Sequence, residues 1–404
     1  MSTPLKRILF VGSNRTLGQG FAAAAGEAKG WTVSFAEKAA EALFVMEKLP
    51  REAVVAETHL PDRSGVELLE EVQHRHPQTT RVLLSAQGTL DGKLQTIGKP
   101  HHHLHEPATA AQLLEVLERA EALRTSLPNP TLPSVILQMH RLPSPPEVYH
   151  QLVGVLNSGD ASLDQVGELI LQDPALCAKL LHLANAATTG LRFRVNHPMY
   201  ALAYLGLETT KALVLLAQTC SCFEQLPATT FNLKSFQEHS LAVGRYAQQI
   251  TKLEQGRAAL ADQAFSAGLL HDLGKLLLAA NLPPMFKAAL KMAREQGRPP
   301  WEMEAKLIGA NHAEVGAYVL GTWNLSVSII EAVAWHHAPL RAPGTSPSFS
   351  ALTAVHVANE LEHQAGGGPA RPCRTEVQLD YLKQLGCEDR LTHWTQSCTE
   401  LDCV

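Results

Sequence analysis

The 404-residue sequence lacks the features that mark membrane and secreted proteins. Its longest apolar runs, such as residues 212–217, are far shorter than the roughly 20 residues that a transmembrane helix requires. The N-terminal segment MSTPLKRILFVGSN has only four apolar residues after its basic pair, too few for a secretory signal core. We therefore expect a cytoplasmic protein with no membrane segment.

Basic clusters and metal-binding cysteine patterns are also missing. The formal net charge of -5 is small for this length, and Lys and Arg are scattered, so no nucleic-acid or acidic-lipid surface is indicated. The seven cysteines show no zinc-ribbon spacing, which favours reduced cytoplasmic thiols. The length of the chain predicts two or three domains.

The most unusual stretch is FSAGLLHDLGKLLLAA, residues 265–280, where His271, Asp272 and Lys275 interrupt an apolar run. Its leucines and alanines recur at spacings of three and four, which predicts a mostly buried helix. Burying the His-Asp doublet unpaired would cost several kcal/mol. The doublet could be stabilised either by coordinating a metal ion or by joining a hydrogen-bonded network of side chains. The doublet alone favours neither.

Residues 5–122 alternate between short apolar runs and helical patterns. The apolar runs predict strands at residues 8–11, 32–35, 53–56, 81–84 and 102–104. Apolar spacings of three and four predict helices at residues 17–28, 39–48, 66–76 and 110–123. Strands that alternate with helices predict a doubly wound, parallel five-stranded sheet covered on both faces.

The order of these elements, and above all AVVAETHLPDRSGVELLEEV at residues 53–72, resembles the receiver domain of two-component response regulators. In that family a phosphoacceptor Asp ends the third strand, four residues before a proline. Counting back from Pro61 places Glu57 at the acceptor position. The resemblance also implies that Ser85 occupies the hydroxyl position after strand four, and that Glu106 stands where the family carries a Lys.

Several receiver residues are replaced. Gly12-Ser13-Asn14 stands where the family has the acidic pair that holds magnesium. Lys99, before a proline, is a competing candidate for the family's Lys, but it lies close to Ser85 in the sequence. We therefore predict a pseudo-receiver that keeps the fold and has lost phosphorylation. A simpler role for Glu57, as a solvated residue at the end of a strand, is compatible with this interpretation.

Four histidines, His101, His102, His103 and His105, form a short tract. Strand alternation would place three of them on one side and His102 on the other. Neither a carboxylate nor a cysteine pattern accompanies them, so we interpret them as surface histidines rather than a metal site.

Proline-rich segments separate this region from a helical one. Prolines within residues 128–133 and 143–146 mark a linker over residues 125–146, after a receiver-like domain at 1–124. Residues 147–340 show almost only helical periods and predict an all-α domain. Residues 341–404 read as a C-terminal helical extension, with a helix at 351–364 and no function that we can assign.

The segments LPSPPEVYHQLVGVLNS, AGLLHDLGKLLLA and HAEVGAYVLGTWNLSVSIIEAVAWHH together resemble an HDOD domain. This family is a helical relative of the HD phosphohydrolases and occurs beside receivers in bacterial signalling proteins. Its members are generally regarded as regulatory. The resemblance implies a non-catalytic output module of a two-component or phosphorelay system, with protein partners and a possible homodimer.

HD phosphohydrolases bind metals through an ordered set of histidines and aspartates. The matching positions here are His239, His271, Asp272, His312, His336 and His337. The resemblance therefore implies a divalent metal, Fe, Mn, Zn or Mg. Each histidine could equally be a core residue that is hydrogen-bonded to a neighbour.

Two differences argue against catalysis. Asn359 stands where the family's last Asp would be, and an amide does not offset the charge of two cations. The GYP segment of the cyclic-di-GMP hydrolases is absent after His312. We expect a regulator that lacks a catalytic residue. The alternative is a metal-dependent phosphohydrolase acting on a nucleotide or cyclic dinucleotide, with Asp272 and Lys275 as its catalytic residues.

Overall fold

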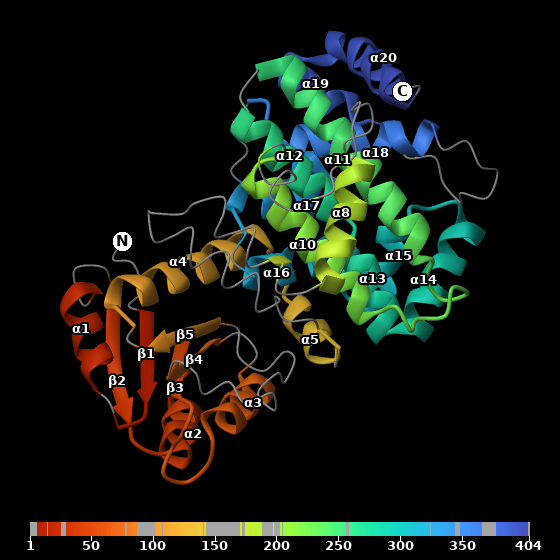
Figure 1. Ribbon diagram of the computed structural model, residues 1–404. Coiled ribbons are helices and arrows are strands. Elements are labelled where there is room, and N and C mark those ends of the chain that lie inside the picture. The colour runs from red at the N-terminus through yellow and green to blue at the C-terminus, as the bar shows by residue number, and fades with distance from the viewer. Residues whose placement is uncertain are drawn as a thin grey trace. The chain divides into compact units, whose positions relative to one another are not determined.

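A computed structural model of the chain divides into two compact units, residues 1–144 and 145–404 (Figure 1). The residues that it describes are 6–13, 15–25, 30–76, 79–86, 102–106, 108–139, 141–142, 170–171, 174–187, 197, 203, 205–255, 258–323, 325–343, 348–365 and 377–402. Much of the predicted all-α domain before residue 205 lies outside these residues, as do Lys99 and His101.

The N-terminal unit contains a sheet of five parallel strands in the order β2-β1-β3-β4-β5. The strands are β1 (Lys6–Val11), β2 (Trp31–Ala36), β3 (Ala53–Glu57), β4 (Thr80–Ala86) and β5 (His102–Glu106). The central strand β3 is almost entirely buried, as expected for a parallel strand that is covered on both faces.

Helices cover both faces of this sheet, so the doubly wound arrangement is confirmed. The helices are α1 (Thr16–Ala25), α2 (Ala39–Lys48), α3 (Gly65–Arg75) and α4 (Ala110–Ser126). One core cluster joins the sheet to Met46 of α2 and Leu69 of α3. A second cluster joins it to Phe21 of α1 and Leu113 of α4. A short helix, α5 (Leu132–Leu137), lies within the predicted linker.

Every described element of the second unit is helical. The α-helices are α8 (Pro174–Ala187), α10 (Leu207–Cys222), α11 (Leu233–Gln255), α12 (Ala258–Leu270), α13 (Leu273–Asn281), α14 (Pro283–Gln296), α15 (Pro300–Ile308), α16 (His312–Thr322), α17 (Val327–Trp335), α18 (Ala351–Ala365), α19 (Leu379–Gln384) and α20 (Leu391–Asp402). Short 3-10 turns lie at Pro339–Arg341 and Glu388–Arg390. Within the described parts of the chain, no helix combines the length and apolar composition that crossing a membrane requires.

Helix α18 belongs to the core of this unit. Its first eleven residues are buried, and it packs against α11, α12 and α17 (Figure 1). The described cysteines are free thiols, as expected from their spacing: Cys177, Cys220, Cys222, Cys387 and Cys398.

The expected single helix over residues 265–280 is instead two helices, with the His-Asp doublet between them. Helix α12 ends at Leu270, and Asp272 is the N-terminal capping residue of α13. The His271 ring helps to end α12, because its Nδ1 donates to the Gly268 carbonyl at 2.7 Å. That bond satisfies one of the carbonyls that a helix end leaves without an intrahelical partner. The apolar period continues across the break, which is why periodicity alone predicted one helix.

Helices α13 and α16 approach each other through two glycines, Gly274 and Gly316. A Cβ atom on Gly274 would lie 1.9 Å from the carbonyl oxygen of His312 and 2.9 Å from the backbone nitrogen of Gly316. This close approach places the start of α13, where Asp272 lies, beside His312 at the start of α16.

Replacing Gly274 with alanine should destabilise the chain by about 1 to 3 kcal/mol, because the added methyl group meets backbone atoms that cannot move aside. Gly20→Ala is the matched control: Gly20 is exposed in α1 with nothing near its Cβ position, so alanine should stabilise by about 0.5 to 1 kcal/mol. Urea-denaturation curves followed by circular dichroism measure both. Equal effects of the two substitutions would contradict this account of the helix contact.

Candidate metal centre

The structure brings all six predicted metal ligands together. His239 comes from the first half of α11, and His271 and Asp272 from the turn between α12 and α13. His312 is the first residue of α16, and His336 and His337 follow the end of α17. Five histidine side chains from four separate parts of the sequence therefore meet around the Asp272 carboxylate.

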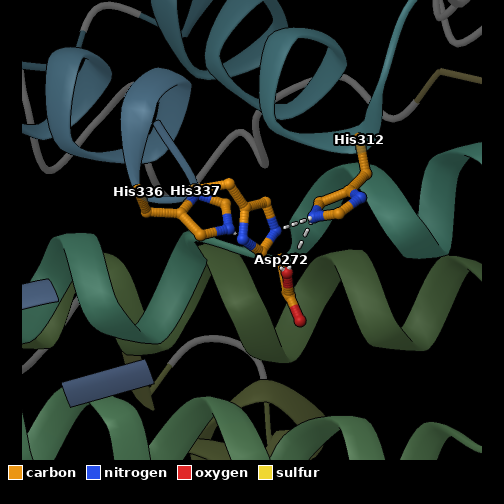
Figure 2. A group of neighbouring side chains, drawn as sticks. All are labelled: Asp272, His312, His336 and His337. Atoms are coloured by element: carbon orange, nitrogen blue, oxygen red, sulfur yellow. Dashed lines mark hydrogen bonds and ion pairs between the residues drawn. The ribbon is translucent and has the colours of Figure 1, made fainter. Parts of the chain in front are cut away.

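One oxygen of Asp272 faces two histidines, and a third histidine lies beside them (Figure 2). Its Oδ1 lies 3.3 Å from Nε2 of His312 and 3.8 Å from Nε2 of His336. Nε2 of His337 lies 2.9 Å from Nε2 of His312. One ligand atom from each of these four residues lies within 4.8 Å of the other three.

The other oxygen of Asp272 faces a different pair of histidines. Its Oδ2 lies 3.4 Å from Nε2 of His239 and 3.4 Å from Nε2 of His271. The ammonium of Lys275 donates to the same oxygen at 2.5 Å. The two groups share the Asp272 carboxylate.

Several ligand atoms are buried without a hydrogen-bond partner. They are Oδ1 of Asp272, Nε2 of His336 and Nδ1 of His337. Leaving such atoms unpartnered costs free energy, and the network of side chains that was the alternative to a metal does not satisfy them. Imidazole nitrogens and a carboxylate oxygen are good ligands for divalent transition metals, so the residues present fit a metal ion.

The outward-facing ring nitrogens are held by hydrogen bonds that leave Nε2 pointing inward. Nδ1 of His336 donates to the Val333 carbonyl at 2.7 Å, as His271 does to Gly268. Nδ1 of His312 lies 2.6 Å from Oε2 of Glu304, and Nδ1 of His239 lies 2.6 Å from Oε2 of Glu362. Such contacts orient metal-binding histidines and fix the tautomer.

The surroundings of Asp272, His336 and His337 favour the metal-binding form of each side chain. Burial alone would raise the pKa of Asp272, but the neighbouring His271 and Lys275 outweigh it and hold the pKa well below its usual range. Burial and the adjacent rings lower the pKa values of His336 and His337, which keeps both imidazoles neutral. An ionised carboxylate and neutral imidazoles are the forms that coordinate metal ions.

Glu304 and Glu362 were not predicted from the sequence. Glu304 is fully buried, and its Oε2 also accepts a hydrogen bond from the backbone nitrogen of His312 at 2.9 Å. The sequence carried one signal for Glu304. It lies four residues before the apolar Ile308, so a helix places its carboxylate on the same buried face of α15.

Asn359 lies on the face of α18 that is turned toward the cluster. Three residues before it, His356 donates from Nδ1 to the His336 carbonyl at 2.7 Å, and three residues after it, Glu362 contacts His239. Both polar atoms of the Asn359 amide are buried without a hydrogen-bond partner.

The C-terminal extension, to which the sequence assigned no function, also contacts the cluster. The side chain of Gln378 donates to the His337 carbonyl at 3.0 Å, and its backbone nitrogen donates to Nε2 of His356 at 3.0 Å. Burial lowers the pKa of His356 to about 4, which keeps this ring neutral and able to accept that bond.

In the N-terminal unit, Glu57 is the last residue of β3, and its carboxylate turns toward the loop after β1. It accepts hydrogen bonds from the backbone nitrogen and the hydroxyl of Ser13, at 3.2 and 3.3 Å. A Cβ atom on Gly12 would lie 2.3 Å from the Glu57 carboxyl carbon, so this glycine makes room for the side chain. Ser85 lies in β4 and Glu106 ends β5, in neighbouring pairs of the β4–β5 register.

Comparisons with known proteins give one family match and two relatives. Residues 142–339 match the HDOD domain model. An uncharacterized protein of Treponema pallidum is 28% identical over 214 residues, which are 53% of this chain and 38% of that protein. The response regulator protein PilR of Pseudomonas aeruginosa is 32% identical over 85 residues, 21% of this chain and 19% of that protein. The matches thus span well under half of these relatives.

A solved structure shares the fold of the chain. An HDOD domain protein of unknown function from Geobacter sulfurreducens is 23% identical, with a TM-score of 0.55. The alignment covers 70% of this chain and 95% of that protein.

Glu304→Gln should lower the affinity for a divalent metal by about 10- to 100-fold, because the amide no longer orients His312 with a negative charge. The control is Glu302→Gln on the same helix, where the carboxylate forms an exposed ion pair with Arg298. Titration of the apoprotein with zinc in the presence of a competing chelator measures both affinities. Identical values for the two variants would contradict the role of Glu304.

Proposed function

We propose that this chain, in which an HDOD domain follows a receiver-like domain, is a signal-transduction regulator whose helical unit holds a divalent metal without turning over a substrate. The observation that carries the proposal is the buried Asp272 carboxylate, which lies between two groups of histidines with unpartnered ligand atoms. The imidazole-rich set favours Fe, Zn or Mn over Mg.

A bound metal would link parts of the fold that are far apart in the sequence. His239, His271, Asp272, His312, His336 and His337 would hold it. The ion would supply a cross-link between α11, the α12–α13 turn, α16 and the end of α17. Its binding free energy would add to the stability of the folded unit, so occupancy would control the order of this helical surface.

Burial and charge both favour regulation over catalysis. A hydrolytic metal site keeps a coordination position open to water and substrate. Here His271, His312 and His336 are fully buried. The neutral amide of Asn359 adds no charge to offset a second cation.

The receiver-like domain would act without phosphorylation. Its candidate acceptor, Glu57, is hydrogen-bonded to Ser13, and the loop after β1 carries Ser13 where magnesium-binding carboxylates would be needed. We propose that this domain serves dimerisation or the docking of a protein partner in the cytoplasm.

One observation favours the second candidate, a metal-dependent phosphohydrolase acting on a nucleotide or cyclic dinucleotide. The ammonium of Lys275 is partly exposed and touches Asp272. An ammonium beside a metal site is well placed to bind a phosphate oxygen. In that mechanism Lys275 would bind the substrate anion, and Asp272 would hold the metal.

A phosphodiesterase assay separates the two candidates. The metal-loaded chain should hydrolyse neither bis-p-nitrophenyl phosphate nor a cyclic dinucleotide above the background rate of His271→Ala, because the ligand set is closed to substrate. Turnover by the wild-type chain that is abolished in His271→Ala would overturn the regulatory proposal.

Acetyl phosphate should leave the receiver-like domain unmodified, because the acidic pair that would hold magnesium is missing. Intact-mass spectrometry of the chain after incubation with acetyl phosphate and magnesium measures the result. A stable acyl phosphate on Glu57, absent from Glu57→Gln, would show that phosphorylation is retained.

A further inference from the structure

A second group of ligand atoms lies at the outer side of His239. Nδ1 of His239 is 2.6 Å from Oε2 of Glu362, and Nδ1 of His363 is 3.1 Å from the same oxygen. The His239 and His363 rings stack, with centroids 4.9 Å apart and planes inclined by 17°. One ligand atom from each of the three residues lies within 4.8 Å of the other two.

Exposure increases from the buried cluster toward this group. The side chain of Asp272 is 3% exposed, that of His239 12%, that of Glu362 16% and that of His363 26%. A cation that enters the buried cluster must cross some partly exposed edge of it.

A different partly exposed edge of the cluster repels cations. It is formed by Lys275, whose side chain is 25% exposed and whose ammonium sits on Asp272. A positive charge there raises the energy of an approaching metal ion, whereas the carboxylate of Glu362 lowers it. Electrostatics therefore favours entry past Glu362.

His239 belongs to both groups. Its Nε2 faces Asp272 and His271, and its Nδ1 faces Glu362. A neutral imidazole carries one proton, so it offers one nitrogen lone pair at a time. With the proton on Nε2, Nδ1 can bind a cation in the outer group; with the proton on Nδ1, Nε2 can bind it in the inner cluster.

We propose that His239, Glu362 and His363 form an outer site for a divalent transition-metal ion, through which the buried cluster is loaded. This inference rests on the proposed metal-binding function. Two imidazoles and a carboxylate suit Zn, Fe or Mn, and three protein ligands leave positions for water. The outer site is therefore weak and exchanges quickly, whereas the inner cluster retains the ion.

The simpler interpretation gives His363 no role in metal uptake. In it, Glu362 only orients His239, and His363 only covers that ring. A variant of Glu362 would change both the orientation of His239 and the outer site, so it does not separate the two interpretations. His363→Ala does, because His363 stacks on the His239 ring and contacts Glu362 but is not itself one of the six inner ligands.

The experiment uses the full-length chain, stripped of metal by a chelator and mixed with Co²⁺ in a stopped-flow spectrometer. Formation of the cobalt absorption bands reports loading of the inner cluster. His363→Ala should slow loading about tenfold, the lower end of the effect of a focusing charge or ligand on an association rate. The final bands of the inner cluster should be unchanged, and a weak additional equivalent of Co²⁺ should be lost.

Gln364→Ala is the matched control, since Gln364 is the exposed next residue of α18. It should load at the wild-type rate. Equal loading rates and equal cobalt stoichiometry in wild type and His363→Ala would overturn the outer site while leaving the inner metal centre intact. No cobalt uptake by the wild-type chain would overturn the proposed function itself, and the outer site with it.

Discussion

The helical unit is organised around a buried carboxylate that carries two separate sets of contacts. One oxygen of Asp272 faces His312 and His336, and the other faces His239 and His271. A lone ionised carboxylate at this depth would be strongly unfavourable, because its hydration is lost. The break between α12 and α13 and the glycine contact between α13 and α16 follow from this constraint, because both bring ligands to the two oxygens.

The same constraint explains why regulation is the better proposal. A carboxylate enclosed by five histidines can hold metal firmly, but enclosure removes the open position on which hydrolysis depends. The carbonyls of His336 and His337 are bonded to His356 and Gln378. A change in metal occupancy would thus reach α18 and the start of α19 directly.

Periodicity in the sequence was sufficient to predict the described strands and most of the described helices, because each of these elements depends on which of its own residues are buried. The five histidines around Asp272 were predicted as ligands because their order along the chain resembles that of the HD phosphohydrolases. The helix break was missed, since the apolar period runs through it. Glu304, Glu362 and Gln378 were missed because each contacts a ligand on another element of the fold, and helical periodicity within one element does not show which residues of another element it meets.

Anomalous scattering tests the central claim most directly. Crystals of the full-length chain grown with zinc, or with iron under anaerobic conditions, should be measured on both sides of the absorption edge of that metal. We predict an anomalous peak bonded to Asp272 and to the inward-facing nitrogens of its histidines. Histidines that bond only to one another or to water, with no anomalous peak at Asp272, would contradict the metal centre.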